Sequence, residues 1–293
     1  MSTFTAVGPA LNLDGPLPVE PEYSLLNTLR ALSRDVEDGP RPLSIVDSND
    51  RVFNGVNVWG YPIDTPSLWE PCLSGTFRVK EDESDWDQPR FDGLIAYFPI
   101  TCSTITASPE VFARRAEAAL SAKLSFAVEE ALAKGVSGST NPSLADTNLT
   151  QLGGAAVLPQ AGLNFLENAI GETGSQGMIL ATPGIVSAWN FVNLITDENN
   201  EGYAETANGT PVASCGGLIN TDPVGKTGSD PTVGQEWAFA VGPVQVYLGM
   251  LDPPSISEYV DREQNIITYR AERPILPLWD TSLQSGVLID WTP

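Results

Sequence analysis

The stretch PEVFARRAEAALSAKLSFAVEEALAK, residues Pro109–Lys134, decides the fold that we expect of this chain. Ser108 is placed to cap the first free amides, Pro109 suits the first helical turn, and Gly135 is placed to end the helix. An apolar residue recurs at every fourth position, at Phe112, Ala116, Leu120, Leu124, Val128 and Leu132. The pattern predicts one unbroken helix, roughly 39 Å long at about 1.5 Å per residue, that lies across a sheet as part of the core.

The overall charge of the chain limits its partners. The 293 residues include 37 acidic and 15 basic side chains, which gives a formal net charge of −22. An acidic surface repels phosphate backbones and anionic lipid, so we expect neither a basic nucleic-acid groove nor membrane binding. No apolar run is long enough to cross a bilayer.

The residue types that are missing or scattered exclude several chemistries. The sequence has no histidine, which excludes catalytic triads with a histidine base and zinc sites with histidine ligands. Cys72, Cys102 and Cys215 lie too far apart for a zinc knuckle. No secretory signal precedes them, so we expect free thiols and synthesis in a reducing cytoplasm.

Elements on both sides of the long helix predict an α+β fold. Ser24 to Glu37 has the pattern of a short amphipathic helix, and Phe91–Ser103 that of a buried strand. A second helix is expected at Pro159–Gly174, with Leu163, Leu166 and Ile170 on its inner face. Residues 176–189 predict a strand, a turn at Pro183–Gly184 and a short helix.

The remaining strands are expected near the C-terminus, and two other regions are expected to lack a core of their own. Gln235–Leu251 predicts two strands broken at Gly242–Pro243, and further strands follow at 265–274 and 285–291. Residues 198–235 are polar and glycine-rich, which predicts a loop. Residues 50–95 carry three tryptophans but little alternation, so a hairpin there needs another surface on which to lie.

Three short motifs suggest sites, but none of them is convincing. VGKTG at Val224–Gly228 lacks both the preceding glycine and the following helix of a phosphate loop. The acidic run Glu81–Asp87 lacks the spacing of a calcium loop, and Asn208-Gly-Thr matters only in a secreted protein. We therefore predict no catalytic, cofactor-binding or metal site, and no cofactor.

The order of these pieces resembles the major capsid proteins of tailed bacteriophages, especially those of phages that infect actinobacteria. The resemblance is carried by LWEPC (Leu68–Cys72), AYFPITCS (Ala96–Ser103), the long helix, Leu163–Trp189 and ITYRAERPILPLWD (Ile267–Asp280). It covers most of residues 50–293, and residues 198–235 have no counterpart in it.

The resemblance implies the capsid fold of that family, the Johnson fold, and a structural role without enzymatic activity. Residues 1–48 are then an N-terminal arm, 49–95 an extended hairpin on a neighbouring subunit, 96–150 with 243–293 a peripheral domain, and 151–242 an axial domain. Copies would assemble into pentamers and hexamers, inside the host cytoplasm, and form the icosahedral virion shell around DNA. Scaffold, portal and decoration proteins are further expected partners.

Other interpretations remain beside this one. Some family members join subunits through a lysine–asparagine bond, for which Lys80 is the one lysine in the corresponding region; a solvated lysine is the preferred interpretation. A separate scaffold, or none, is expected. The alternatives to a viral shell are a nanocompartment shell of the same fold, similar to encapsulin, a tail or decoration protein, and an acidic hydrolase that uses paired carboxylates.

Overall fold

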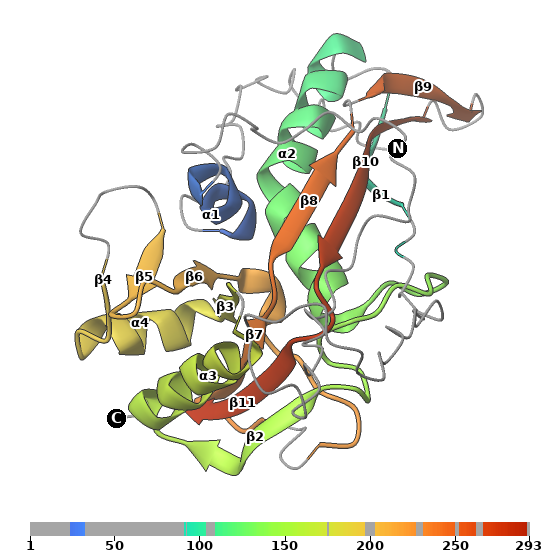
Figure 1. The fold of residues 1–293 in the computed structure, drawn as a ribbon. Coiled ribbons are helices and arrows are strands. Elements are labelled where there is room, and N and C mark those ends of the chain that lie inside the picture. The colour runs from blue at the N-terminus through green and yellow to red at the C-terminus, as the bar shows by residue number, and fades with distance from the viewer. Residues whose placement is uncertain are drawn as a thin grey trace, which may run out of the picture.

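The computed structural model describes residues 24–32, 91, 93–103, 109–174, 176–196, 203–226, 231–249, 252–261 and 266–291 (Figure 1). Within them a long helix, α2, lies against a four-stranded sheet, and a seven-stranded sheet carries helices on the opposite side from α2. The mixed α+β class expected from the sequence is confirmed. The hairpin expected at 49–95 and most of the arm expected at 1–48 lie outside the described residues.

Helix α2 (Pro109–Lys134) has the predicted bounds. All six residues of its apolar stripe are buried, and Glu130 and Lys134 form an i,i+4 ion pair at 3.3 Å on the outer side. Gly135 ends the helix with a φ of 74°, in the left-handed region that glycine adopts without strain. The chain then turns back, and the N–H groups of Leu144 and Ala145 donate to the last helical carbonyls, of Leu132 and Ala133.

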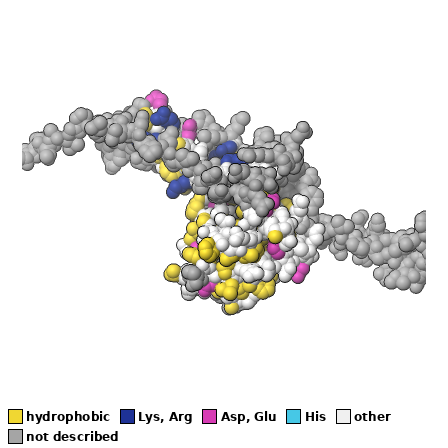
Figure 2. All heavy atoms as spheres, turned by 90° about the vertical axis from the view of Figure 1, so that its left-hand side faces the viewer, with side chains coloured by type: hydrophobic (Ala, Val, Ile, Leu, Met, Phe, Trp, Pro, Cys, Tyr) yellow, Lys and Arg dark blue, Asp and Glu magenta, His cyan; other side chains and the backbone are white. Residues whose placement is uncertain are grey.

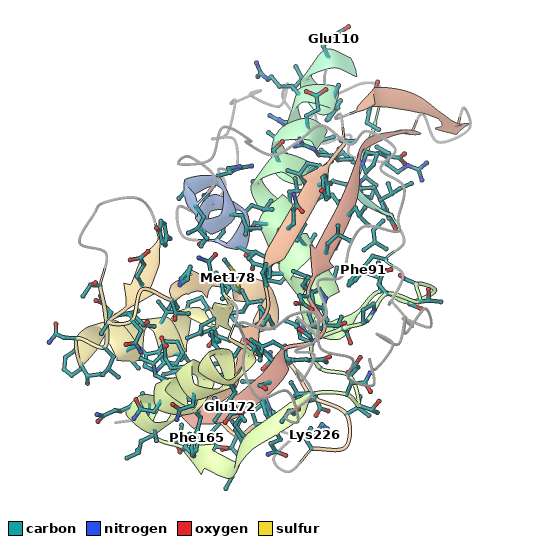
Figure 3. All side chains as sticks on the ribbon, in the orientation of Figure 1. Phe91, Glu110, Phe165, Glu172, Met178 and Lys226 are labelled. Carbon is teal, nitrogen blue, oxygen red and sulfur yellow. The ribbon has the colours of Figure 1, made fainter. Side chains whose placement is uncertain are left out.

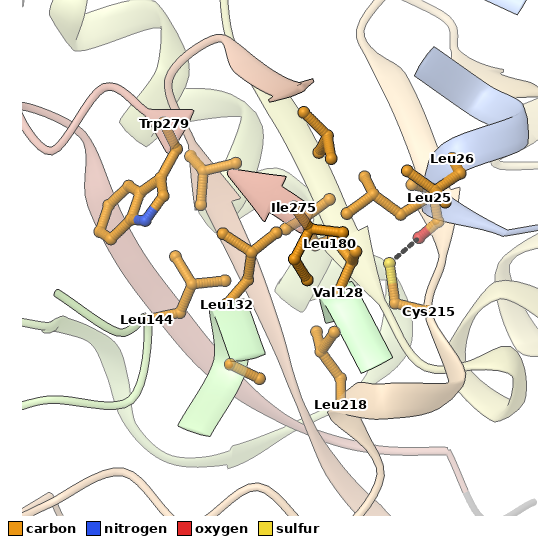
Figure 4. Packing of buried hydrophobic residues seen from close by; sticks show 14 of the residues in the cluster. Leu25, Leu26, Val128, Leu132, Leu144, Leu180, Cys215, Leu218, Ile275 and Trp279 are labelled. Atoms are coloured by element: carbon orange, nitrogen blue, oxygen red, sulfur yellow. Dashed lines mark hydrogen bonds between the residues drawn. The ribbon is translucent and has the colours of Figure 1, made fainter. Parts of the chain in front are cut away.

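The four-stranded sheet consists of β1 (Leu94–Ser103), β8 (Val244–Leu248), β9 (Asp252–Asp261) and β10 (Ile266–Trp279). All its pairings are antiparallel, and β10 lies between β1 and β8. Tyr269 of β10 stacks on Phe112 of α2, with ring centroids 6.1 Å apart. Ala271 and Ile275 of β10 belong to the core that contains Leu120 to Leu132 of α2, in which Figure 4 labels Ile275. Strand β10 is longer than the sequence pattern predicted.

The expectation that Phe91–Ser103 is a buried strand is wrong for one face of β1. Ala96 is buried, whereas Ile95 and Tyr97 are 63% and 61% exposed. Alternate residues of a strand point to opposite faces, and only one face of this sheet meets α2. The apolar run therefore continues onto an uncovered face.

The seven-stranded sheet has the order β2-β11-β7-β3-β6-β5-β4. Its strands are β2 (Thr150–Val157), β3 (Met178–Ala181), β4 (Ile195–Thr196), β5 (Ala204–Thr206), β6 (Pro211–Ser214), β7 (Gln235–Val241) and β11 (Gln284–Asp290). The pairs β2–β11 and β3–β6 are parallel, and the other pairings are antiparallel.

The strands β3, β7 and β11 of this sheet are buried on both faces. Toward the α2 core point Met178, Leu180, Trp237, Phe239 and Leu288. Toward α3 (Pro159–Thr173) and α4 (Pro183–Phe191) point their alternating neighbours Ile179, Ala181, Ala238, Ala240, Val287 and Ile289. Continuous apolar runs are therefore required in these strands, and β11 is buried on both sides instead of alternating with a polar face.

Helices α3 and α4, on the face of the sheet opposite α2, were both predicted from the sequence, and one detail of the prediction is wrong. Leu163, Leu166 and Ile170 of α3 are buried as expected. The turn expected at Pro183–Gly184 is wrong, because both residues form the first turn of α4, where proline is tolerated. The indole N–H of Trp189 in α4 donates to the carbonyl of Pro159 over 2.8 Å, which ties the two helices together.

The loop expected at residues 198–235 is also wrong in its central part. Strands β5 and β6 and the 3₁₀ helix η1 (Gly216–Leu218) lie there, and Val212, Ala213 and Cys215 are buried. Short strands between glycines carry too little periodicity to be recognised, and the pairing with β3 decides their conformation. Strand β2 was missed for the same reason, since Gly153 and Gly154 interrupt it.

Helix α1 (Leu25–Leu32) is the described part of the N-terminal region. Leu25, Leu26, Thr28 and Ala31 are buried, and Leu25 and Leu26 belong to the same core as α2 (Figure 4). The amphipathic helix expected from the sequence is confirmed over these eight residues.

Candidate functional site: exposed apolar surfaces and the α1–α2–η1 junction

Large apolar side chains are exposed at the end of α4 and at the start of α3. Phe191 and Val192, at the end of α4, are 88% and 51% exposed. Leu158, just before α3, is 70% exposed, and Phe165 on α3 is partly exposed. Figure 2 shows hydrophobic side chains gathered over the lower part of the face that α3 and α4 share in Figure 1. We call Phe191 with Val192 the α4 surface, and Leu158 with Phe165 the α3 surface.

The α3 surface continues onto the strand beside it. Gly153 of β2 has a φ of 78°, and a Cβ there would lie 3.4 Å from the Phe165 ring and 3.3 Å from Val157. Figure 3 labels Phe165 at the lower side of the molecule. The ring thus lies over the backbone of β2, which pairs with β11 on one edge. Complete burial of a large apolar side chain is favourable by about 1.5–3 kcal/mol, so the free energy falls when another surface covers these side chains.

The uncovered face of β1 is a third exposed area, made of Ile95 and Tyr97. The guanidinium of Arg270 lies over the Tyr97 ring, 5.8 Å from its centroid, and Arg270 also pairs with Glu272. Such a cation–π contact at an exposed site contributes about 0.5–1 kcal/mol. The apolar pair therefore lies beside the Arg270–Glu272 ion pair on the same exposed face.

A buried carboxylate joins three elements inside the molecule. Glu129 of α2 is 2% exposed. Its Oε1 accepts hydrogen bonds from the N–H of Leu25 in α1 and from the hydroxyl of Ser125, both at 3.0 Å. Its Oε2 accepts from the N–H of Gly217 in η1, also at 3.0 Å. We call this arrangement the α1–α2–η1 junction.

Two residues complete the junction. The hydroxyl of Ser125 accepts from the N–H of Leu26 over 3.2 Å while it donates to Glu129. Gly217 is required by the close approach of η1 to α2, because a Cβ there would lie 2.5 Å from the Glu130 nitrogen and 2.8 Å from the Phe126 carbonyl oxygen. Both are backbone atoms, which cannot move aside as the end of a flexible side chain can.

Burial changes the ionisation of two groups at the junction. Loss of solvation raises the pKa of Glu129, and hydrogen bonds from Gly217, Leu25 and Ser125 oppose that rise without overcoming it. Burial raises the pKa of the Cys215 thiol well above its ordinary value, and the nearby Glu129 charge adds to this rise. Cys215 is consequently a neutral, packed thiol in the folded chain.

The motifs singled out in the sequence have other roles or lie elsewhere. Lys226 of VGKTG donates to the Thr147 carbonyl oxygen at 3.0 Å, and the N–H of Val224 donates to that of Ala145 at 2.9 Å, so this stretch holds the loop after α2. The Asn208 amide donates to Glu167 Oε2 over 3.1 Å. Lys80 and the acidic run 81–87 lie outside the described residues.

Two absences apply to the described residues alone. They contain no helix that combines the length and apolar character of a membrane span. They also contain no cluster of three or more cysteine, aspartate or glutamate side chains arranged to hold a metal ion.

Sequence reasoning missed Ser125 and Glu129. Both lie next to the apolar stripe of α2, directly after Leu124 and Val128, and they are spaced four residues apart. A polar pair at i,i+4 on the buried side of a helix is the signal that could have indicated them.

Comparisons with known proteins give structural matches only. No family model matches the sequence, and no curated protein matches it either. Among solved structures, a chain of Mycobacterium phage Ogopogo is 12% identical, with a TM-score of 0.46 over 74% of this chain and 82% of that one.

Two further structural matches are chains of an encapsulin complex and of a capsid. A chain of the holo-SrpI encapsulin complex from Synechococcus elongatus PCC 7942 is 11% identical, with a TM-score of 0.42 over 71% of this chain and 77% of that one. A chain of the capsid of an empty GTA particle is 10% identical, with a TM-score of 0.42 over 75% of this chain and 81% of that one.

Proposed function

We propose that this chain is the major capsid protein of a tailed bacteriophage. In this role copies assemble into pentamers and hexamers, inside the host cytoplasm, and these form an icosahedral virion shell around DNA. The role is structural and requires no catalytic residue and no cofactor. The ordered series of stretches that resemble this family supports the proposal, and the exposed surfaces described above support it independently.

The exposure of large apolar side chains at several separate places, among them the three described above, is the observation that carries the proposal. These three places lie on different elements: the α4 surface, the α3 surface and the face of β1. Covering any one of them lowers the free energy. Single exposed apolar side chains are common on monomers, whereas large ones gathered into a surface mark a site of contact with another molecule. A shell subunit contacts neighbours on several sides, and many modest contacts hold it firmly.

The long helix suits a subunit of this kind. Helix α2 packs on β10 and β1 and also contacts η1, which stands beside the seven-stranded sheet. A 26-residue helix that joins both sheets resists their relative bending. Such stiffness keeps the geometry of repeated contacts constant from copy to copy.

The division of the chain into arm (1–48), hairpin (49–95), peripheral domain (96–150 and 243–293) and axial domain (151–242) belongs to the same proposal. One segment is best reassigned within it. Strand β11 pairs with β2 and β7, so residues 284–290 join the sheet of the axial domain. Arm and hairpin would lie on adjacent copies, and scaffold, portal and decoration proteins would be further partners.

Electron microscopy of the full chain in negative stain tests the proposal. We expect rings or closed shells when the protein is expressed and concentrated, and the same chain as the main protein of purified virions. The proposal would be contradicted if the chain stayed a monomer of 31.3 kDa at every concentration and ionic strength and were absent from purified virions.

A nanocompartment shell would use the same surfaces, and the contents of the particle distinguish the two. Shells treated with nuclease and then opened should release protected DNA if the particle is a phage capsid. A protein cargo without DNA would establish the alternative instead.

A further inference from the structure

Two stretches of this strongly acidic chain carry no charged side chain. The formal net charge is −22 and 18% of all residues are charged, yet residues 147–166 and 173–196 contain no aspartate, glutamate, lysine or arginine. The first stretch includes β2 and the start of α3, and the second includes all of α4. Acidic surfaces of identical chains repel one another, so close contact between copies is least opposed where charge is absent.

The two uncharged stretches meet on one side of the molecule. The indole N–H of Trp189 in α4 donates to the carbonyl oxygen of Pro159, at the start of α3, over 2.8 Å. Leu158 directly precedes Pro159, and Phe191 follows Trp189 by two residues. The α3 surface and the α4 surface therefore lie near each other, and Figure 1 shows both helices on the same side of the seven-stranded sheet.

The two surfaces differ in shape, and the difference suits contact between them. Phe191 is the last residue of α4 and projects into solvent, with 88% of its surface exposed. Beside Phe165, Gly153 and Gly154 leave a strip of β2 without side chains, and Gly154 has open space where a Cβ would be. A projecting ring fits such a strip, with Leu158 and Phe165 at its sides. Another α4 surface offers no strip of this kind.

The backbone at the two helix ends favours the same pairing. Helix α3 begins at Pro159 without a side-chain cap, so its first N–H groups carry a partial positive charge, and the last carbonyls of α4 carry a partial negative charge. Contact of an α4 surface with an α3 surface brings opposite partial charges together. Contact between two α4 surfaces, or between two α3 surfaces, brings like partial charges together.

We propose that the α4 surface of one copy packs against the α3 surface and the Gly153–Gly154 strip of the next copy. A contact between two different surfaces of identical chains is heterologous, and it closes into a ring when the rotation between copies allows. Each copy then uses both surfaces, one toward each neighbour, and the side of the molecule that carries them faces the ring axis. The inference rests on the proposed function, in which copies assemble, and adds which residues meet.

Disulfide cross-linking between two singly substituted full-length chains tests the pairing. Leu158→Cys and Phe191→Cys are co-expressed, and their assemblies are oxidised mildly and analysed by gel electrophoresis without reductant. A disulfide requires Cα atoms within about 7 Å, so the mixture should give at least about tenfold more cross-linked dimer than either variant alone. Each chain carries one new cysteine, so the two positions cannot be joined within a chain. Both side chains are mostly exposed, so folding should not depend on them.

Two controls and a second pair make the result specific. The wild type measures cross-links through the three natural cysteines. Tyr97→Cys, at an exposed position on β1, takes the place of Leu158→Cys in a mixture with Phe191→Cys and should add no dimer. Val192→Cys with Phe165→Cys spans the same contact and should behave as the first pair.

Three results would overturn the proposal. The first is as much dimer from Phe191→Cys alone as from the mixture, because α4 surfaces would then pair with one another. The second is assembly into rings or shells in which neither pair cross-links above the wild type, which removes this contact and leaves the proposed function standing. The third is a chain that remains a monomer, which contradicts the contact and the proposed function together. Cross-linked rings that never close into shells would support the contact and contradict the shell.

Discussion

The N–H of Gly217 donates to Glu129 Oε2 at 3.0 Å, and this bond forms because η1 approaches α2 closely enough to exclude any side chain at position 217. The bond connects the seven-stranded sheet to the long helix through backbone and carboxylate. The contact is polar, yet it lies inside the core.

Substitution of Gly217 should therefore destabilise the fold. Gly217→Ala places a Cβ 2.5 Å from the Glu130 nitrogen and is expected to lower the free energy of unfolding by about 1–3 kcal/mol, as overpacking does. Urea unfolding followed by circular dichroism measures this. Gly216→Ala is the matched control, because a Cβ there meets the Phe126 ring at an ordinary 3.5 Å. Equal stability of the two variants would show that η1 is not held against α2.

The apolar stripe of α2 should be equally sensitive. Leu120 is buried in the core shared with β10, and Leu120→Ala is expected to cost about 2–5 kcal/mol through lost burial and a residual cavity. The same unfolding experiment applies. Ser121→Ala, at the next and exposed position, should change stability by less than about 0.5 kcal/mol. A loss below about 1 kcal/mol for Leu120→Ala would argue against the packing of α2.

Cys215 should make stability depend on alkaline pH. Burial raises the pKa of its thiol, so the folded chain keeps the proton above pH 9.0, where the unfolded thiol loses it. Ionisation then favours the unfolded state, and stability falls as pH rises, by at most about 1.4 kcal/mol per pH unit for this group.

Unfolding of wild type and Cys215→Ala at pH 8, 9 and 10 isolates this contribution, because all other groups cancel in the difference. The wild type should lose more stability than the variant between pH 9 and 10. Parallel pH profiles would mean that the thiol ionises in the folded chain.

The α4 surface should be needed for assembly and not for folding. Phe191→Asp is expected to reduce the fraction of chain in rings or shells by at least about tenfold, because it places a charge where an apolar contact forms. The circular dichroism spectrum should be unchanged, since this side chain is 88% exposed. Asn190→Asp adds the same charge at the neighbouring exposed position and should assemble as the wild type. Undiminished assembly of Phe191→Asp would remove Phe191 from the contact.

Local signals explain what the sequence predicted well. The bounds of α2 were predictable because Pro109 and Gly135 mark its ends and the stripe between them is continuous. Helix α3 and the break between β7 and β8 at Gly242–Pro243 have similarly strong markers. The residues that determine such elements lie within them or directly beside them in the sequence.

Elements that depend on distant partners could not be predicted in this way. Strand β6 has four residues and becomes a strand because β3 lies beside it, and the exposed face of β1 is visible only once α2 is placed on the other side. Glu129 looks like an ordinary helical glutamate until α1 and η1 meet it from residues 104 and 88 positions away. Its role arises from tertiary structure alone.

The position of β11 has a consequence for the order of events during synthesis. This strand lies between β2 and β7, which precede it by many residues along the chain. A nascent chain that has not yet reached Gln284 therefore lacks the strand that joins β2 to β7 in the larger sheet, and pairings between segments so far apart in sequence form slowly. Chains truncated before β11 therefore cannot complete the seven-stranded sheet, and this excludes them from contacts that need the finished sheet.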